Sequence, residues 1–516
     1  MTLHAQSHDD APNVLRLRRL GIDTYQEPVI YMAADCPVCR SEGWEAQARI
    51  AVTLPERSII ATLNVITGAL LAPDEASLSE SAWVALGARD GDRVVLSHPK
   101  PLVSLSDVRA KLYGRELDQA SFERVIGDIA TGRYSAIELT AFVAACAGGR
   151  LSLQETIALT RAMIGVGDRL AWPAPVVADK HSVGGLPGNR TTMIVVPIIA
   201  ASGLVMPKTS SRGITSPAGT ADAMETLAPV ALDLPAMQRV VDREGGCIVW
   251  GGAVRLSPAD DVIIRIERPL DIDSEGQLVA SVLSKKAAAG ATHVVIDVPI
   301  GPSAKIRTPE SAESLGAVLT VVGQAVGLTL DVVHGDGAQP IGRGIGPALE
   351  ARDVLSVLRG EAGAPADLRE RALVLSGRLL ELAGAVTSGQ GHAAAASVLD
   401  DGRAWRKFQA ICEAQGGMHE PPRARYTHTL VARSGGTLID IDNRRLARVA
   451  KLAGAPKSAA AGLELHVRLG DTLEPDSPLI TVHAQSPGEL QYSLSYAGEN
   501  LDLFRIENSG SLRPIP

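Results

Sequence analysis

The chain has 516 residues, 46% of them hydrophobic, which is long enough for three or four domains with sizeable cores. Only 3% of the residues are aromatic, which argues against a protein that stacks the bases of single-stranded nucleic acid. The formal net charge is -8 and no long run of Lys and Arg is present, so we expect no nucleic-acid partner.

The N-terminal segment MTLHAQSHDDAPNVLRLRRL has no apolar stretch after a basic start, so it does not resemble a signal peptide. The most apolar run, Met193 to Met206, contains Pro197 and is shorter than the roughly 20 residues that cross a bilayer. We therefore expect no membrane partner and a cytoplasmic location.

Two of the five cysteines, Cys36 and Cys39, form a CxxC motif. A structural zinc site usually needs a second such pair, which this sequence lacks. We interpret the motif as two reduced thiols in a turn that contains Pro37, in a protein of a reducing compartment. Zinc binding or redox chemistry is the alternative, and we expect no metal site.

Residues 1–95 are predicted to form a small β-barrel-like domain. Short runs rich in β-branched residues lie at 48–55, 58–66 and 92–99, and each ends near Pro, Gly or Asp. The hydrophobic period then becomes helical over residues 100–172. Ser135 with Glu138, and Ser152 with Glu155, have the spacing of capping boxes, which predicts helices that begin at these positions.

Residues 176–425 alternate between strand, glycine loop and helix, which indicates an α/β domain. TTMIVVPIIAASG suits a buried helix, and THVVIDVPIG (292–301) and LTLDVVHGDG (328–337) suit strands. Residues 426–516 return to short strands with glycine turns, so we expect a C-terminal β-rich domain.

The first candidate site is DKHSVGGLPGNRTT, residues 179–192. Backbone N–H groups in a glycine loop at the start of a helix point at anions, and the helix dipole favours negative charge there. Donor side chains surround this loop: Lys180, His181, Ser182, Thr191 and Thr192. We predict an oxyanion site, most simply for inorganic phosphate; the alternative is an ordinary strand-to-helix turn.

A second glycine loop, SSRGITSPAGTADAMETL, spans residues 210–227. Thr220 is the best donor for a second wall of the anion site, and the alternative is that Thr220 only caps the following helix. Asp222 and Glu225 lie on one face of that helix, and we interpret them as capping and orienting groups rather than metal ligands.

A third segment, residues 263–286, ends in ASVLSKK. Ser281 and Lys285 are four residues apart and share a helix face, and Arg265 and Arg268 precede them. Such side chains can bind the carbonyl and ring edge of a base and stabilise negative charge on it. A solvated, salt-bridged helix is the alternative for this segment taken alone.

Together KHSVGG, SSRGITSPAGTADAMETL and ASVLSKK resemble the signature of the pyrimidine-nucleoside phosphorylases, the family of thymidine phosphorylase. QPIGRGIGPALEARDVL (339–355) and LGDTLEPDSPLITVHA (469–484) fit the same family, so the resemblance covers about 105–484. The extra N-terminal region resembles the long branch, which contains AMP phosphorylases and bacterial thymidine phosphorylases.

The resemblance implies a nucleoside phosphorylase/phosphoribosyltransferase-like fold. A helical dimerisation subdomain, to which residues 258–290 contribute, would accompany a mixed-sheet α/β domain, with a barrel-sandwich-like C-terminal domain. The implied phosphate-binding residues are Lys180, Ser182, Thr192 and Thr220. The implied base-binding residues are Ser281, Lys285 and either Arg265 or Arg268, and His181, with a pKa near neutrality, would help to protonate the leaving base.

The implied activity is reversible phosphorolysis of a pyrimidine (deoxy)nucleoside to free base and (deoxy)ribose 1-phosphate. No cofactor is expected, since inorganic phosphate is a co-substrate, and a homodimer or higher homo-oligomer is expected. The family's usual HTGGT reads SPAGT here, at residues 216–220, which puts thymidine specificity in doubt.

Three other functions stay open. An AMP phosphorylase would release ribose 1,5-bisphosphate and need a second anion site, for which the candidates are Arg190, Ser211, Arg212 and Ser216. A phosphoribosyltransferase would bind magnesium pyrophosphate through Asp222 and Glu225. A non-catalytic nucleotide-binding or scaffold protein would leave these motifs without a chemical role.

Overall fold

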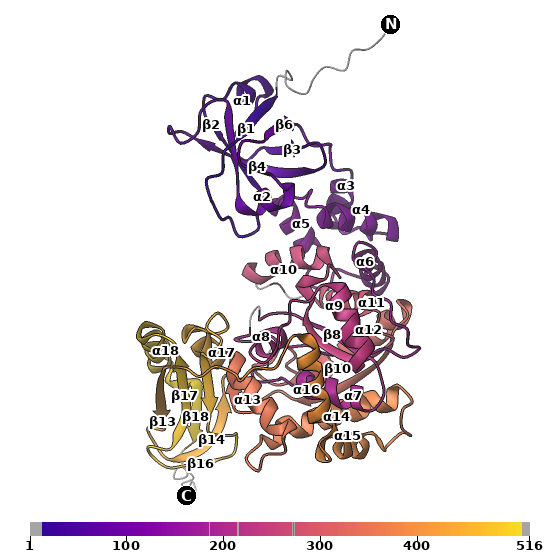
Figure 1. Cartoon of the computed structure of the whole chain (residues 1–516), viewed down its shortest axis with the longest axis vertical. Helices are drawn as coiled ribbons and strands as arrows, with labels where there is room; N and C mark the ends of the chain where they lie inside the picture. The colour runs from indigo at the N-terminus through magenta and orange to yellow at the C-terminus, as the bar shows by residue number, and fades with distance from the viewer. Residues whose placement is uncertain (1–12, 185, 214–215, 271, 273, 508–516) are drawn as a thin grey trace, which may run out of the picture. The chain divides into compact units, whose positions relative to one another are not determined.

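The computed structural model describes residues 13–184, 186–213, 216–270, 272 and 274–507. The chain divides into two compact units, and Figure 1 follows the chain through them by colour. The N-terminal unit takes residues 1–150 together with 261–272, and the second unit takes the rest.

The N-terminal unit contains a closed six-stranded barrel with strand order β1-β5-β2-β4-β3-β6. Its strands are β1 (Val14–Leu17), β2 (Val29–Ala33), β3 (Arg49–Thr53), β4 (Ser58–Ile66), β5 (Glu75–Leu78) and β6 (Arg93–Ser97). In β3 every second side chain is buried, as expected when one face of a strand lines a core. The predicted small barrel is therefore confirmed.

The CxxC motif lies at the start of the short helix α1 (Pro37–Glu42) rather than in a turn. Both thiols are free and are buried among the apolar side chains of the barrel core. A hydrogen bond from the Cys39 thiol lowers the pKa of Cys36 to about 6, and the same bond together with burial raises the pKa of Cys39.

The helices that follow begin where the capping boxes predict. In α5 (Ala136–Cys146) the Ser135 hydroxyl accepts the Glu138 N–H, and the Glu138 carboxylate accepts the Ser135 N–H. Ser152 and Glu155 form the same pair at α6 (Leu153–Gly165). The other helices of this stretch are α2 (Glu80–Leu86), α3 (Leu105–Leu112), α4 (Gln119–Ala130) and, further along the chain, α10 (Pro258–Leu270).

The α/β part of the second unit has two parallel sheets. Its strands are β7 (Ala178–Ser182), β8 (Met206–Ser210), β9 (Gly246–Trp250), β10 (His293–Ile300) and β11 (Thr329–Asp336). They pair in the orders β11-β10-β7 and β8-β9, and a parallel bridge between Val177 and Val205 joins the two sheets. The expected mixed sheet was wrong for these strands, because every pairing among them is parallel.

Parallel pairing places the candidate loops at one edge, because the carboxyl ends of parallel strands meet there. β7 ends in Ser182 before the first glycine loop, and β8 ends in Ser210 before the second. Helices surround these strands (Figure 1): α7 (Thr192–Ala201), α8 (Thr220–Glu225), α9 (Leu234–Glu244), α11 (Glu275–Ala288), α12 (Pro309–Ala325), α13 (Pro347–Leu358), α14 (Ala366–Leu382), α15 (Gly391–Asp400) and α16 (Arg403–Gln415).

The predicted buried helix is α7, which contains Pro197 and packs into the main apolar core. It is only ten residues long. In the part of the chain that the structure describes, no helix has the length and apolar character needed to cross a membrane.

The C-terminal region has two small antiparallel sheets, β12-β15-β17-β13 and β16-β14-β18. The strands are β12 (Gly344–Ile345), β13 (Tyr426–Val431), β14 (Gly436–Ile441), β15 (Gly462–Leu465), β16 (Thr472–Leu473), β17 (Pro478–Ala484) and β18 (Phe504–Glu507). Two helices that the sequence analysis did not anticipate pack with them, α17 (Asn443–Leu452) and α18 (Pro487–Glu499). The barrel-sandwich form stays a prediction.

Candidate functional site

Lys180, the lysine of the first glycine segment, lies on β7 with only 1% of its surface exposed. Its Nζ donates a hydrogen bond of 2.8 Å to the Thr191 hydroxyl and lies 3.7 Å from a carboxylate oxygen of Asp297. Burial lowers the pKa of Lys180 to about 8, although Asp297 opposes the shift. The ammonium therefore lies beside the residue that precedes α7, where an incoming anion would also meet the N–H groups of that helix.

Asp297 on β10 connects three of the polar side chains at this edge of the sheet. It is fully buried, forms an ion pair with Arg371 of α14, and accepts a hydrogen bond of 3.1 Å from the Asn189 amide. The same amide nitrogen lies 3.2 Å from the Ser182 hydroxyl, to which it also donates. Lys180 and Ser182, predicted together, thus share a hydrogen-bonded network through residues that the sequence analysis missed.

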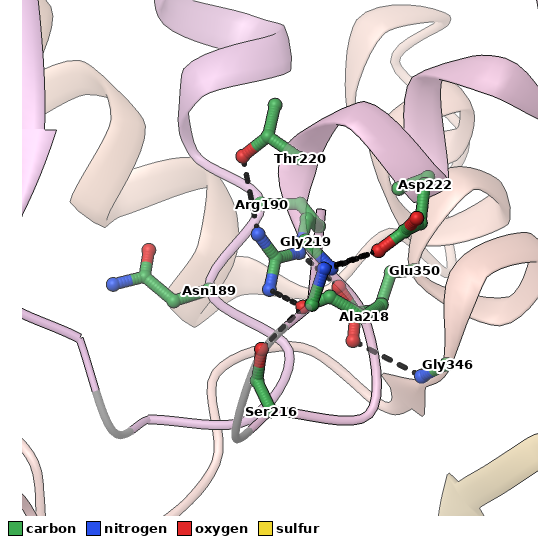
Figure 2. Close-up of polar contacts among 12 residues, drawn as sticks. Asn189, Arg190, Ser216, Ala218, Gly219, Thr220, Asp222, Gly346 and Glu350 are labelled. Atoms are coloured by element: carbon green, nitrogen blue, oxygen red, sulfur yellow. Dashed lines mark hydrogen bonds and ion pairs between the residues drawn. The ribbon is translucent and has the colours of Figure 1, made fainter. Parts of the chain in front are cut away.

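Arg190 belongs to the first glycine loop and donates hydrogen bonds to two residues of the second, as Figure 2 shows. Its Nη1 donates to the Thr220 hydroxyl over 3.1 Å, and its Nη2 donates to the Ala218 carbonyl over 2.8 Å. Its Nε forms an ion pair with the buried Glu350 of α13, which also accepts the Gly346 N–H at 3.0 Å. Burial raises the pKa of Glu350, and Arg190 opposes that shift.

Asp222 organises the second loop from within it. Its carboxylate accepts the N–H groups of Gly213 and Gly219, over 2.6 and 2.8 Å. Gly219 is the N-cap of α8, so the alternative interpretation, in which Thr220 caps this helix, was wrong by one residue. Thr220 begins the helix instead.

Glu225, the other acidic residue of α8, binds Arg212 over 2.8 Å. This hydrogen bond lowers the pKa of Glu225. Arg212 also lies 3.2 Å from Asp222, and its guanidinium stacks over the Trp250 ring at 5.0 Å. The roles of Asp222 and Glu225 in this structure are those of capping and orienting groups.

A second buried charge cluster lies next to Lys180. The Asp179 carboxylate accepts hydrogen bonds from Lys208 of β8 over 2.9 Å and from Lys286 of α11 over 2.7 Å. Burial alone would raise the pKa of Asp179, but the two lysines lower it to about 2. Burial, and then the charges of Lys286 and Lys208, hold the pKa of His181 well below its ordinary value. This direction differs from the near-neutral pKa expected for His181 and favours a neutral imidazole at pH 7.

Ser281 and Lys285 lie on one partly exposed face of α11, as their spacing predicted. Lys285 forms an ion pair with the buried Asp260, which the sequence analysis did not single out. Arg265 and Arg268 lie on α10 in the stretch assigned to the N-terminal unit, and the Arg268 side chain lies outside the described residues. The base-binding role of either arginine stays a prediction.

Three family descriptions match the chain in order. "Glycosyl transferase family, helical bundle domain" matches residues 108–167, "Glycosyl transferase family, a/b domain" matches 174–405, and "Pyrimidine nucleoside phosphorylase C-terminal domain" matches 437–503.

Curated relatives match almost the whole chain. "Putative thymidine phosphorylase" of Polaromonas sp. (strain JS666 / ATCC BAA-500) is 62% identical over 495 residues, covering 96% of this chain and 97% of the relative. "Putative thymidine phosphorylase 2" of Acidovorax sp. (strain JS42) is 60% identical, covering 98% of this chain and 99% of the relative. "Putative thymidine phosphorylase" of Legionella pneumophila (strain Corby) is 58% identical, covering 96% of this chain and 96% of the relative. The chain belongs to the thymidine/pyrimidine-nucleoside phosphorylase family. It is therefore an enzyme of the pentosyltransferase type.

The phosphorylase family match also includes the barrel. The three family descriptions begin at residue 108, but the relatives align over 96–98% of the chain, so the alignments include most of the N-terminal strands.

Among solved structures, anthranilate phosphoribosyltransferase from Thermus thermophilus has a TM-score of 0.48 and 20% identity, covering 60% of this chain and 98% of that one.

Proposed function

We propose that this phosphorylase cleaves a pyrimidine (deoxy)nucleoside with inorganic phosphate, reversibly, to give free base and (deoxy)ribose 1-phosphate. The proposed phosphate ligands are Lys180, Ser182, Thr192 and Thr220. The proposed base ligands are Ser281, Lys285 and one arginine, Arg265 or Arg268.

The observation that carries the proposal is an excess of positive charge beneath the first glycine loop. Among the described residues, five cations and three carboxylates make up three adjacent ion-pair groups. The cations are Lys180, Arg190, Lys208, Lys286 and Arg371, and the carboxylates are those of Asp179, Asp297 and Glu350. With all of them ionised, the groups have a surplus of two positive charges, which a phosphate dianion would balance. Burial lowers the pKa of Lys286 to about 7, so the full surplus develops as a neighbouring anion binds and favours the charged ammonium. Buried charge without a counterion is costly, so a dianion should bind here.

The chemistry needs positioning and charge compensation more than a strong nucleophile. Phosphate held by Lys180 and the loop hydroxyls attacks C1′, and the bond to the base breaks with its electron pair going to the base. The Lys285 ammonium and the Ser281 hydroxyl stabilise that developing negative charge. His181 is neutral, so we assign it a hydrogen-bond donor's role rather than that of an imidazolium acid.

We propose a nucleoside rather than a nucleoside 5′-monophosphate as the substrate. A 5′-phosphate would need a further anion site, and the two arginines expected for it already bind carboxylates, Arg190 on Glu350 and Arg212 on Glu225. The Ser216 hydroxyl donates to the Ala218 carbonyl. Ser211, which is exposed, is the remaining candidate and has no charge. Lys180 and Lys285 are also paired with carboxylates, Asp297 and Asp260, so the base-release assay below decides between the two substrates.

The test is phosphate-dependent base release from thymidine, uridine and AMP, measured side by side with the purified protein. We expect release from thymidine or uridine and none from AMP. Lys285→Ala should lower kcat/KM by about 100-fold, since one preorganised stabilising group typically contributes that much. Release from AMP alone would move the assignment to nucleotide phosphorolysis, and an unchanged Lys285→Ala variant would overturn the base-site assignment.

A further inference from the structure

Asp179 and Lys286 connect two elements that carry different parts of the proposed site. Asp179 immediately precedes Lys180 on β7, and Lys286 immediately follows Lys285 on α11. The Asp179 carboxylate and the Lys286 ammonium are 2.7 Å apart. Asp179 exposes 2% of its surface and Lys286 exposes 3%. The contact therefore joins the strand of the phosphate lysine to the helix of the base lysine through one buried ion pair.

The geometry of the carboxylate makes this contact directional. One oxygen of Asp179 accepts its neighbour's backbone N–H, that of Lys180, over 2.7 Å, and also accepts the Lys208 ammonium. The other oxygen accepts Lys286. A shift of the backbone at Lys180 would therefore move the Asp179 carboxylate, and this carboxylate would in turn move Lys286 and α11.

Stability alone does not account for this arrangement. A buried ion pair gains little over well-packed apolar side chains of similar volume, because both charges lose their hydration. Here two lysines share one carboxylate, which adds repulsion between the two ammonium groups. A positioning role explains why charge is present between two elements that apolar packing could have joined.

We propose that the Asp179–Lys286 ion pair is a positioning bridge that couples phosphate binding at β7 to nucleoside binding at α11. The bridge rests on the proposed function. When phosphate fixes Lys180, Asp179 holds Lys286, and α11 presents Ser281 and Lys285 to the base in one register. Each co-substrate then binds more tightly when the other is present, and by linkage the effect is reciprocal.

The test is an initial-rate matrix in which phosphate and the nucleoside substrate are varied together. It yields the interaction factor, which is the ratio of nucleoside affinity at saturating phosphate to nucleoside affinity extrapolated to zero phosphate. In the wild-type protein we expect a factor of about 5 to 150, the usual range of such coupling. Lys286→Met should bring the factor close to one and lower kcat. Because it removes one charge of the surplus, it should also raise the phosphate KM at low nucleoside about as much as Lys208→Met does. Lys286→Arg should restore most of the coupling.

Lys208→Met is the matched control. It removes the other lysine from the same carboxylate, but Lys208 lies on β8 and has no part in presenting α11, so the interaction factor should be kept. If Lys286→Met does not fold, Asp179→Asn keeps the side-chain shape and weakens the pair by removing its charge. A wild-type factor in either bridge variant, or equal loss in Lys208→Met, would overturn the bridge while leaving the proposed function intact. A wild-type protein without phosphorolysis of any nucleoside would overturn both.

Discussion

At the scale of single residues, Lys180 should set the alkaline limb of activity. Its pKa is about 8 because it is buried, and phosphate needs the protonated ammonium. As pH rises through that value the charged fraction falls, so kcat/KM for phosphate should decline with an apparent pKa near 8. The measurement is the pH profile of kcat/KM, which reports groups of the free enzyme.

Lys180→Arg provides the control for this assignment. A guanidinium stays charged over the whole working range, so residual activity in the variant should show an alkaline limb at higher pH. A limb that stays near pH 8 in Lys180→Arg would assign the titration to another group.

Residue types and glycine spacing were enough to single out Lys180 and Ser182, which the structure joins in one network, but not the carboxylate between them. Lys180 and Ser182 stand out because they lie in one short segment beside glycines. Asp297 is distant in sequence and reaches them only through the register of β10 on β7, in which it pairs with Ser182. One signal was present, since an aspartate inside the apolar strand THVVIDVPIG has to find a buried partner.

At the scale of elements, Arg190 should hold the two glycine loops and α13 together. Arg190→Met leaves Glu350 buried without its cation, which should lower the unfolding free energy by about 3–5 kcal/mol. The substitution also removes the hydrogen bonds from Arg190 to the Thr220 hydroxyl and the Ala218 carbonyl. The phosphate KM should therefore rise by about tenfold, roughly the contribution of one charge-assisted hydrogen bond. Urea unfolding and phosphate kinetics measure the two effects.

The double variant Arg190→Met with Glu350→Gln separates the two effects. The glutamine removes the unpaired charge and can still accept the Gly346 N–H, so much of the stability should return. The phosphate KM should stay high, because the loops remain unlinked. A double variant as unstable as Arg190→Met would show that charge burial is not the cause.

Hydrophobic period and capping chemistry predicted most elements, and the misses have local causes. The C-terminal β pattern hid two helices, although Ser486 and Glu489 form a capping box at α18 with a proline at its first turn. Parallel pairing in the central sheet could not be read from the strands alone, because register and direction depend on the helices between them.

At the scale of the whole molecule, the surplus of buried positive charge should make stability depend on phosphate and on pH. Without an anion, the depressed pKa of Lys180 means that the folded protein binds fewer protons than the unfolded chain between about pH 8 and 10.5. Stability from this residue therefore rises with pH across that window. Bound phosphate should flatten the rise, because a neighbouring anion favours the charged ammonium.

Phosphate should accordingly raise the thermal unfolding temperature of the second unit at pH 7. At 100 times its dissociation constant, a ligand that binds only the folded state adds about 2.7 kcal/mol. Differential scanning calorimetry with phosphate, and with sodium chloride of matched ionic strength, measures the shift.

The chloride sample controls for screening, and Lys180→Met should lose most of the phosphate effect. The barrel has none of the residues of the charge cluster, so a separate barrel transition should not move. Equal stabilisation by chloride and phosphate would contradict a built dianion site, because screening alone would then explain the result.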